Sequence, residues 1–119
     1  MASVKDCEGA LRRLAASLAE VDPELRARHL PTRRVACRIK DLDVVYVARL
    51  DEDGVHGLVA TSPVGEIPAD TEVKVTVTSD DLMALANGED DVLQAWLRGR
   101  VQISAPMRDM LRLRALVGL

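Results

Sequence analysis

Aromatic side chains are nearly absent from this chain: its 119 residues include one Trp, one Tyr and no Phe. Proteins that bind single-stranded nucleic acid stack bases on several exposed rings, so this composition argues against nucleic-acid binding. The formal net charge of −3 adds no overall attraction to nucleic acid. Val, Leu, Ala, Met and Ile must fill the interior. Two readings follow: the composition of a GC-rich bacterial genome, or a deformable aliphatic interior that admits an acyl chain.

Cysteine and histidine are also scarce, with two of each. Cys7 and Cys37 are far apart and form no CxxC motif, which argues against a zinc site and predicts free thiols. His29 and His56 have no nucleophile or carboxylate at a spacing typical of a catalytic relay. A glycine-rich phosphate loop is also missing. We therefore expect no catalytic residue, no metal and no cofactor, and a protein that is not an enzyme.

Long hydrophobic runs are missing as well. A spanning helix needs about 18 or more apolar residues in succession, and no segment approaches that length. Lys5, Asp6 and Glu8 interrupt the N-terminal stretch where a signal peptide would be apolar. The length suits one domain, residues 1–119. These features predict a soluble, cytoplasmic protein.

The hydrophobic pattern predicts the order of the secondary structure. Apolar residues at helical spacing between Leu11 and Val21 indicate a first helix, which Asp22-Pro23 should end, with a turn through about Pro31. Alternation with a period of two predicts strands near 34–40, 43–50, 55–60, 72–78 and 100–104. The order of elements predicts the α+β class: a five-stranded, mostly antiparallel sheet with helices covering one face.

Helix signals flank the last predicted strand. Thr78 or Ser79 should cap one short helix, which Asn87-Gly88 ends, and Asp90 or Asp91 should cap a second. The final helix should begin at Pro106, a residue favoured in the first turn.

Charges are segregated towards the C-terminus. Acidic residues dominate 80–91, and five arginines follow with only Asp109 against them: Arg98, Arg100, Arg108, Arg112 and Arg114. The basic segment is either a solvated helix face or a surface that meets phosphate, coenzyme A or lipid headgroups.

The segment from Val73 to Leu119 carries the most informative pattern. A strand with alternating valines precedes "TSDDLMALANGEDDVLQAWLRGRVQIS", residues 78–104, and a helix rich in Leu and Met follows. This order of elements resembles the sterol carrier protein type-two domain. The resemblance implies a sheet and helices that enclose an apolar tunnel for fatty acyl chains, acyl-coenzyme A, sterols or phospholipids, without catalytic residues.

The resemblance also implies which residues line the tunnel. They come from the two short helices, the last strand and the final helix: Leu82, Leu85, Leu93, Trp96, Leu97, Val101, Ile103, Met107, Met110 and Leu111. Arg108 and Arg112 are the expected contacts for a charged headgroup. The final helix would act as the gate.

Two functional hypotheses remain open. The first is a non-catalytic module that binds or transfers a lipid or fatty acyl ligand, with transient membrane contact. The second is an interaction or accessory module with the same fold and a core filled by side chains, which uses the final helix to form a homodimer or to dock on a protein partner.

Overall fold

A five-stranded mixed sheet organises the chain in the computed structural model, which describes residues 2–61 and 66–117. The strand order is β3-β2-β1-β4-β5, built from β1 (Arg33–Ile39), β2 (Val44–Asp51), β3 (Gly54–Ala60), β4 (Val73–Val77) and β5 (Gln102–Ser104). The central pairing of β1 with β4 is parallel, and the other pairings are antiparallel. The predicted α+β class and the five strands are confirmed, with small shifts at the strand ends.

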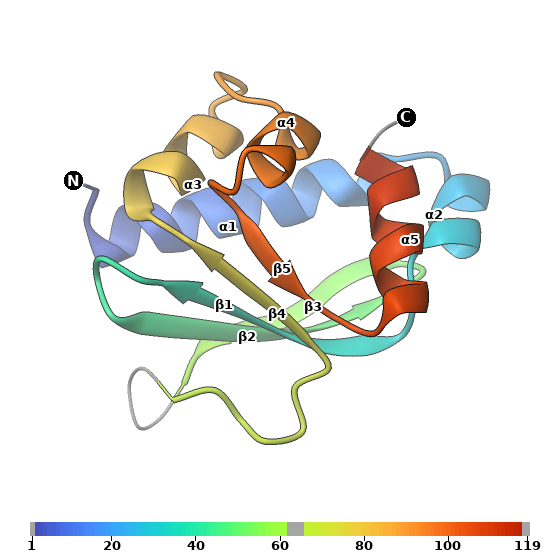
Figure 1. Cartoon of the computed structure of the whole chain (residues 1–119), viewed down its shortest axis with the longest axis horizontal. Helices are drawn as coiled ribbons and strands as arrows, with labels where there is room; N and C mark the ends of the chain where they lie inside the picture. Colours follow the sequence, from blue (N-terminus) through green and yellow to red (C-terminus); the bar gives the residue numbers. More distant parts are fainter. Residues whose placement is uncertain (1, 62–65, 118–119) are drawn as a thin grey trace.

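The helices gather on one face of this sheet (Figure 1). They are α1 (Val4–Ala19), α2 (Pro23–His29), α3 (Ser79–Ala86), α4 (Val92–Leu97) and α5 (Met107–Val117). Helix α1 lies along the sheet and packs against α3, whereas α2 and α5 lie side by side at one end. The inner face of the sheet is thus roofed by α1, α3 and α4 and closed at one end by α2 and α5.

Helix α2 corrects the prediction of a plain turn up to Pro31. Pro23 does end the first helix, but it also occupies the first turn of the second one. The carboxylate of Asp22 accepts a hydrogen bond from the backbone N–H of Glu24 at 2.8 Å, as an N-cap does. His29 is therefore the last residue of a helix, and α2 provides the surface against which α5 packs.

Side-chain caps fix the helices that cover the sheet. Ser3 and Asp6 form a capping box at the start of α1. Thr78 caps α3 by accepting a hydrogen bond from the backbone N–H of Asp81 at 3.2 Å. Gly88, at a φ of 74°, follows the end of α3 in the left-handed region that glycine favours.

A bulge in β3 shapes the edge of the sheet. The register with β2 shifts between the pairs Val47–Val59 and Arg49–His56, so two residues of β3 lie opposite Ala48. One of them, Gly57, has a φ of 68°, a conformation that costs a residue with a Cβ much more. The extra residue lets both Val55 and Leu58 contribute to the inner face of the sheet.

Candidate functional site

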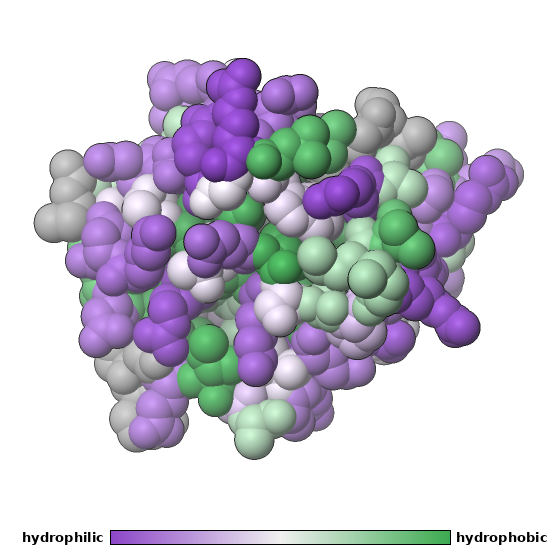
Figure 2. Space-filling view, in the orientation of Figure 1, coloured by the Kyte–Doolittle hydropathy of each residue, from purple (hydrophilic) through white to green (hydrophobic). Residues whose placement is uncertain are grey.

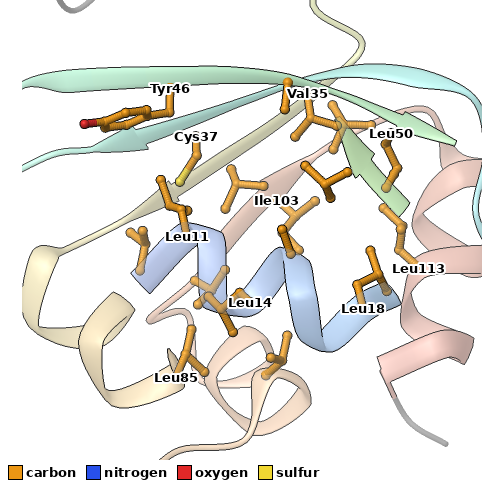
Figure 3. Close-up of a pocket in the computed structure, with 18 of the residues that line it drawn as sticks. Leu11, Leu14, Leu18, Val35, Cys37, Tyr46, Leu50, Leu85, Ile103 and Leu113 are labelled. Carbon is orange, nitrogen blue, oxygen red and sulfur yellow. The ribbon is translucent and has the colours of Figure 1, made fainter. Parts of the chain in front are cut away.

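An apolar cavity of about 340 Å³ lies between the inner face of the sheet and the helices (Figure 3). Side chains from the sheet, α1, α3, α4 and α5 converge on it. Its walls are almost entirely aliphatic, because the strands and helices both turn their apolar side chains inward at this level.

The sheet supplies the floor of the cavity through residues two apart. These are Val35 and Cys37 of β1, Tyr46, Ala48 and Leu50 of β2, Val73, Val75 and Val77 of β4, and Ile103 of β5. Successive side chains of a strand point to opposite faces, so the alternation that predicted the strands also selects the residues of the floor.

The roof is supplied mainly by one stripe of α1. Leu11, Leu14 and Leu18 recur at spacings of three and four residues and line the cavity (Figure 3). Leu82 and Leu85 of α3, with Val92 and Trp96 of α4, continue the roof. Figure 3 shows Leu113 of α5 approaching from the far end, near Leu18 and Leu50.

Polar groups on the cavity wall are few and uncharged at neutral pH. Burial raises the pKa of the Cys37 thiol to about 12, so the group remains protonated. Burial also raises the pKa of the Tyr46 phenol, and the nearby Glu8 carboxylate acts in the same direction. The wall therefore offers weak hydrogen-bonding groups and no charge to an occupant.

A buried ion pair fixes α5 at the end of the cavity. Asp109 has no exposed surface, and its carboxylate lies 2.7 Å from Nε of Arg33 on β1. Nη2 of the same guanidinium lies 3.3 Å from the second carboxylate oxygen. This two-pronged contact orients Asp109 towards the sheet, and it places Leu113 and Leu116 of the same helix at the cavity.

Half of the predicted tunnel-wall residues line this cavity. They are Leu82 and Leu85 of α3, Trp96 of α4, and Val101 and Ile103 around β5. Leu93 and Met110 are half-buried but do not line it. Contact of the lining residues with a ligand remains a prediction.

The placement of Leu97, Met107 and Leu111 corrects the sequence-based expectation. Their exposed fractions are 57%, 74% and 64%, so these side chains face away from the cavity. The physical reason for the two residues of α5 is the ion pair with Arg33, which turns Asp109 inward and therefore turns the Met107–Leu111 side outward. The inward apolar residues of α5 are Leu113 and Leu116 instead.

The two arginines predicted to meet a headgroup have different surroundings. Arg108 is exposed, and no carboxylate of the described residues pairs with it. Arg112 is half-buried and donates a long hydrogen bond, 3.4 Å, to the backbone carbonyl of Arg28 on α2. Neither lines the cavity.

Sequence reasoning missed the contribution of the N-terminal half to the cavity. Leu11, Leu14 and Leu18 were visible as one stripe of a helix, and Val35 and Cys37 as one face of a strand, but neither pattern distinguishes a filled core from a hollow one. Asp109 was also missed, although a single carboxylate among arginines was the available signal.

Within residues 2–61 and 66–117, no three His, Cys, Asp or Glu side chains come together in a way that could hold a metal ion. Within the same residues, no helix has the length and apolar character needed to cross a membrane.

Comparison with known proteins gives structural matches alone. No protein-family model matches the chain, and no curated protein matches it by sequence. Sterol carrier protein 2-like 2 from Aedes aegypti superposes in its crystal form with a TM-score of 0.64 at 18% identity, over 95% of this chain and 98% of that one. Its palmitated form in solution gives 0.62 at 19% identity, over 94% of each chain.

Two other matches have the same fold in a ubiquinone synthesis protein and in an enzyme. The SCP2 domain of UbiJ, a ubiquinone synthesis protein, gives a TM-score of 0.58 at 18% identity over 92% of this chain and 91% of that one. The inverting sec-alkylsulfatase Pisa1 from Pseudomonas sp. gives 0.55 at 20% identity over 89% of this chain. This chain spans only 15% of the length of the sulfatase. The matches show that the chain has the fold of sterol carrier protein 2, as the sequence resemblance implied.

Proposed function

We propose that this protein binds an apolar ligand, a fatty acyl chain or a lipid that carries one, in the cavity beneath α1, and that the binding is non-catalytic. The observation that carries the proposal is the cavity itself: about 340 Å³ with a mostly aliphatic wall that all five strands and the helices α1, α3, α4 and α5 supply. Small-ligand sites usually have volumes of roughly 300–1,000 Å³, so this cavity is large enough for a ligand but small within that range.

The energetics favour an occupant without a charge inside the cavity. Each methylene transferred from water contributes about 0.8 kcal/mol, so ten methylenes offset the cost of association, which is at least about 4 kcal/mol. A charged group of the ligand inside the cavity would lose its water without gaining a partner, because the wall supplies no opposite charge. The ligand therefore enters with its hydrocarbon portion, and a polar headgroup remains outside.

The chemistry of the wall supports binding without catalysis. A thiol becomes a nucleophile as the thiolate, and the pKa of Cys37 near 12 leaves almost none of it at neutral pH. Burial raises the pKa of the Tyr46 phenol above its ordinary value of 10, so the group stays protonated at neutral pH and does not act as a base. The palmitated state of the structural neighbour from Aedes aegypti also supports an acyl chain as the occupant. The cytoplasm remains our predicted location.

The accessory module is the second candidate. Its support is the sulfatase match, in which the same fold makes up a small part of a much longer enzyme. In that role the chain would hold no lipid and would act through its surface. Native mass spectrometry of protein purified from cells separates the two: a carrier retains a heterogeneous set of lipid masses, whereas an accessory module gives the apo mass alone.

A matched pair of variants tests the cavity directly. Val75→Phe adds a ring to the cavity floor on β4, whereas Val47→Phe adds the same ring to the other face of the sheet on β2. We expect Val75→Phe to reduce the binding of a fluorescent fatty acid at least about tenfold, and Val47→Phe to leave it within about twofold. Equal binding by wild type and Val75→Phe, with both folded, would overturn the proposal.

A further inference from the structure

Helix α5 presents an outer face of unusual composition. Met107, Leu111 and Ala115 follow one another at intervals of four residues and form an exposed apolar stripe. Arg108 follows Met107 by one position and Arg114 precedes Ala115 by one position, so the two arginines flank the stripe on opposite sides. We call these five residues the α5 outer face. Figure 2 shows hydrophobic surface beside strongly hydrophilic side chains over this end of the molecule.

The charge of the α5 outer face is all positive. The only carboxylate of the helix, Asp109, is buried and paired with Arg33, so it cancels neither flanking arginine. The guanidinium of Arg114 lies over the Trp96 ring, 4.9 Å from the ring centroid, and this contact restrains its position.

A second copy of the chain fits this face poorly. A two-fold dimer places the same patch on both sides of the interface, so the charged side chains of the patch in both copies would all be positive. Like charges facing each other across an interface disfavour it. An anionic lipid surface has the complementary properties: negative phosphates for the arginines and an acyl region for Met107 and Leu111.

We propose that the α5 outer face docks the protein on anionic lipid bilayers. Met107 and Leu111 insert at the level of the headgroups, and Arg108 and Arg114 contact the phosphates on either side of the inserted stripe. The protein as a whole is acidic, so the attraction is local and orients the molecule with α5 towards the bilayer. Leu113 and Leu116, on the inner side of the same helix, then bring the cavity next to the membrane.

Sedimentation with vesicles tests the docking. The probes are vesicles of phosphatidylcholine alone and of phosphatidylcholine mixed with phosphatidylglycerol, at low and at physiological salt. We expect wild type to bind the mixed vesicles and to lose that binding as salt increases. Arg108→Gln with Arg114→Gln should weaken partitioning about thirtyfold, the product of two lost surface attractions. Met107→Ser with Leu111→Ser should weaken it on both vesicle types.

Controls separate the docking from folding and from ligand uptake. Arg49→Gln with Val59→Ser changes one exposed arginine and one exposed aliphatic residue on the sheet, and should leave vesicle binding unchanged. Val75→Phe fills the cavity and should bind vesicles as wild type does. The docking proposal can therefore fail while the cavity proposal holds, and the cavity proposal can fail while the docking proposal holds. All variants are compared by circular dichroism to verify folding.

Four results would overturn the proposal. The first is equal binding to neutral and anionic vesicles, and the second is equal loss in the Arg49–Val59 control. The third is a concentration-dependent dimer in analytical ultracentrifugation that Met107→Ser with Leu111→Ser abolishes, since the face would then be occupied by a second copy. Retained vesicle binding in the double arginine variant also counts against it.

Discussion

Asp109 on α5 accepts two hydrogen bonds from Arg33 on β1, although the two residues are 76 positions apart in the sequence. Asp109 is fully buried, whereas the Arg33 side chain is 31% exposed. Glu72 lies 3.4 Å from the same guanidinium and is 45% exposed. The pair is thus asymmetric: Arg33 has water and a second carboxylate within reach, and Asp109 depends on Arg33.

The first prediction concerns this asymmetry. Arg33→Gln should lower the free energy of unfolding by about 2–3 kcal/mol, because it leaves the Asp109 carboxylate buried without its cation. Asp109→Asn should cost less, since Arg33 can turn to Glu72 and to water. Urea denaturation followed by circular dichroism measures both changes.

The neighbouring arginine on the same strand serves as the control. Arg34 pairs with Asp70 at 3.2 Å, and both side chains are more than half exposed. Arg34→Gln should therefore change the free energy of unfolding by less than about 1 kcal/mol. Similar losses of unfolding free energy for Arg33→Gln and Arg34→Gln would show that the burial of Asp109 does not determine how much the Arg33–Asp109 pair stabilises the protein.

The second prediction concerns pH and the start of α3. Asp41 accepts hydrogen bonds from the hydroxyl of Ser79 at 2.5 Å and from its backbone N–H at 2.8 Å, and Ser79 is fully buried. The hydroxyl contact, followed by the backbone contact, lowers the pKa of Asp41 below its ordinary value of 3.8. A lowered pKa in the folded state stabilises the protein at pH values above the ordinary pKa, and this contribution disappears as the pH falls through the folded-state pKa.

Wild type and Asp41→Asn should therefore differ in melting temperature at neutral pH and converge in acid, below about pH 4. Differential scanning calorimetry across that range measures the difference. A gap of constant size down to the most acidic condition would contradict an electrostatic origin and point to a purely steric effect of the amide.

The third prediction concerns the thiol in the cavity. Because the pKa of Cys37 is near 12, its reaction with a disulfide reagent at neutral pH should be slower than that of a free thiol by about a thousandfold. The measurement uses a Cys7→Ala variant, so that Cys37 is the only thiol present. Denaturant should restore ordinary reactivity. Rapid labelling of the folded variant would show that the floor of the cavity is open to water.

The fourth prediction uses the only tryptophan. Trp96 lines the cavity, and the guanidinium of Arg114 lies over its ring. Binding of a long-chain fatty acid should change its emission saturably, because the polarity of one face of the ring changes. Arg114→Gln should alter the starting emission and retain the response. Binding detected by another method without any emission change would place the ligand away from Trp96.

The strands were predictable because their signal is local. Valines at alternate positions of 73–77 place one face inward wherever the strand lies in the sheet, so the buried face follows from the pattern. Helix α2 was missed because Pro23 has two meanings: it ends one helix and is also well suited to the first turn of the next. The carboxylate of Asp22 was the signal for the second meaning.

Which side of α5 faces the sheet could not be predicted from the residues of the helix alone. Counting apolar side chains places Met107, Met110 and Leu111 on the inner side, but one buried ion pair outweighs that count because an unpaired carboxylate in the interior is costly. Its partner, Arg33, comes from a distant part of the chain. The same holds for the cavity, whose existence depends on how closely α1 approaches the sheet.

The bulge at Gly57 also affects how this sheet meets other chains. It lies in β3, one of the two edge strands, and interrupts the row of N–H and C=O groups that an added strand would need. The opposite edge, β5, has only three residues and offers a short row. Neither edge suits the growth of the sheet by strand addition, so the protein is guarded against edge-to-edge aggregation even though its strands are rich in valine.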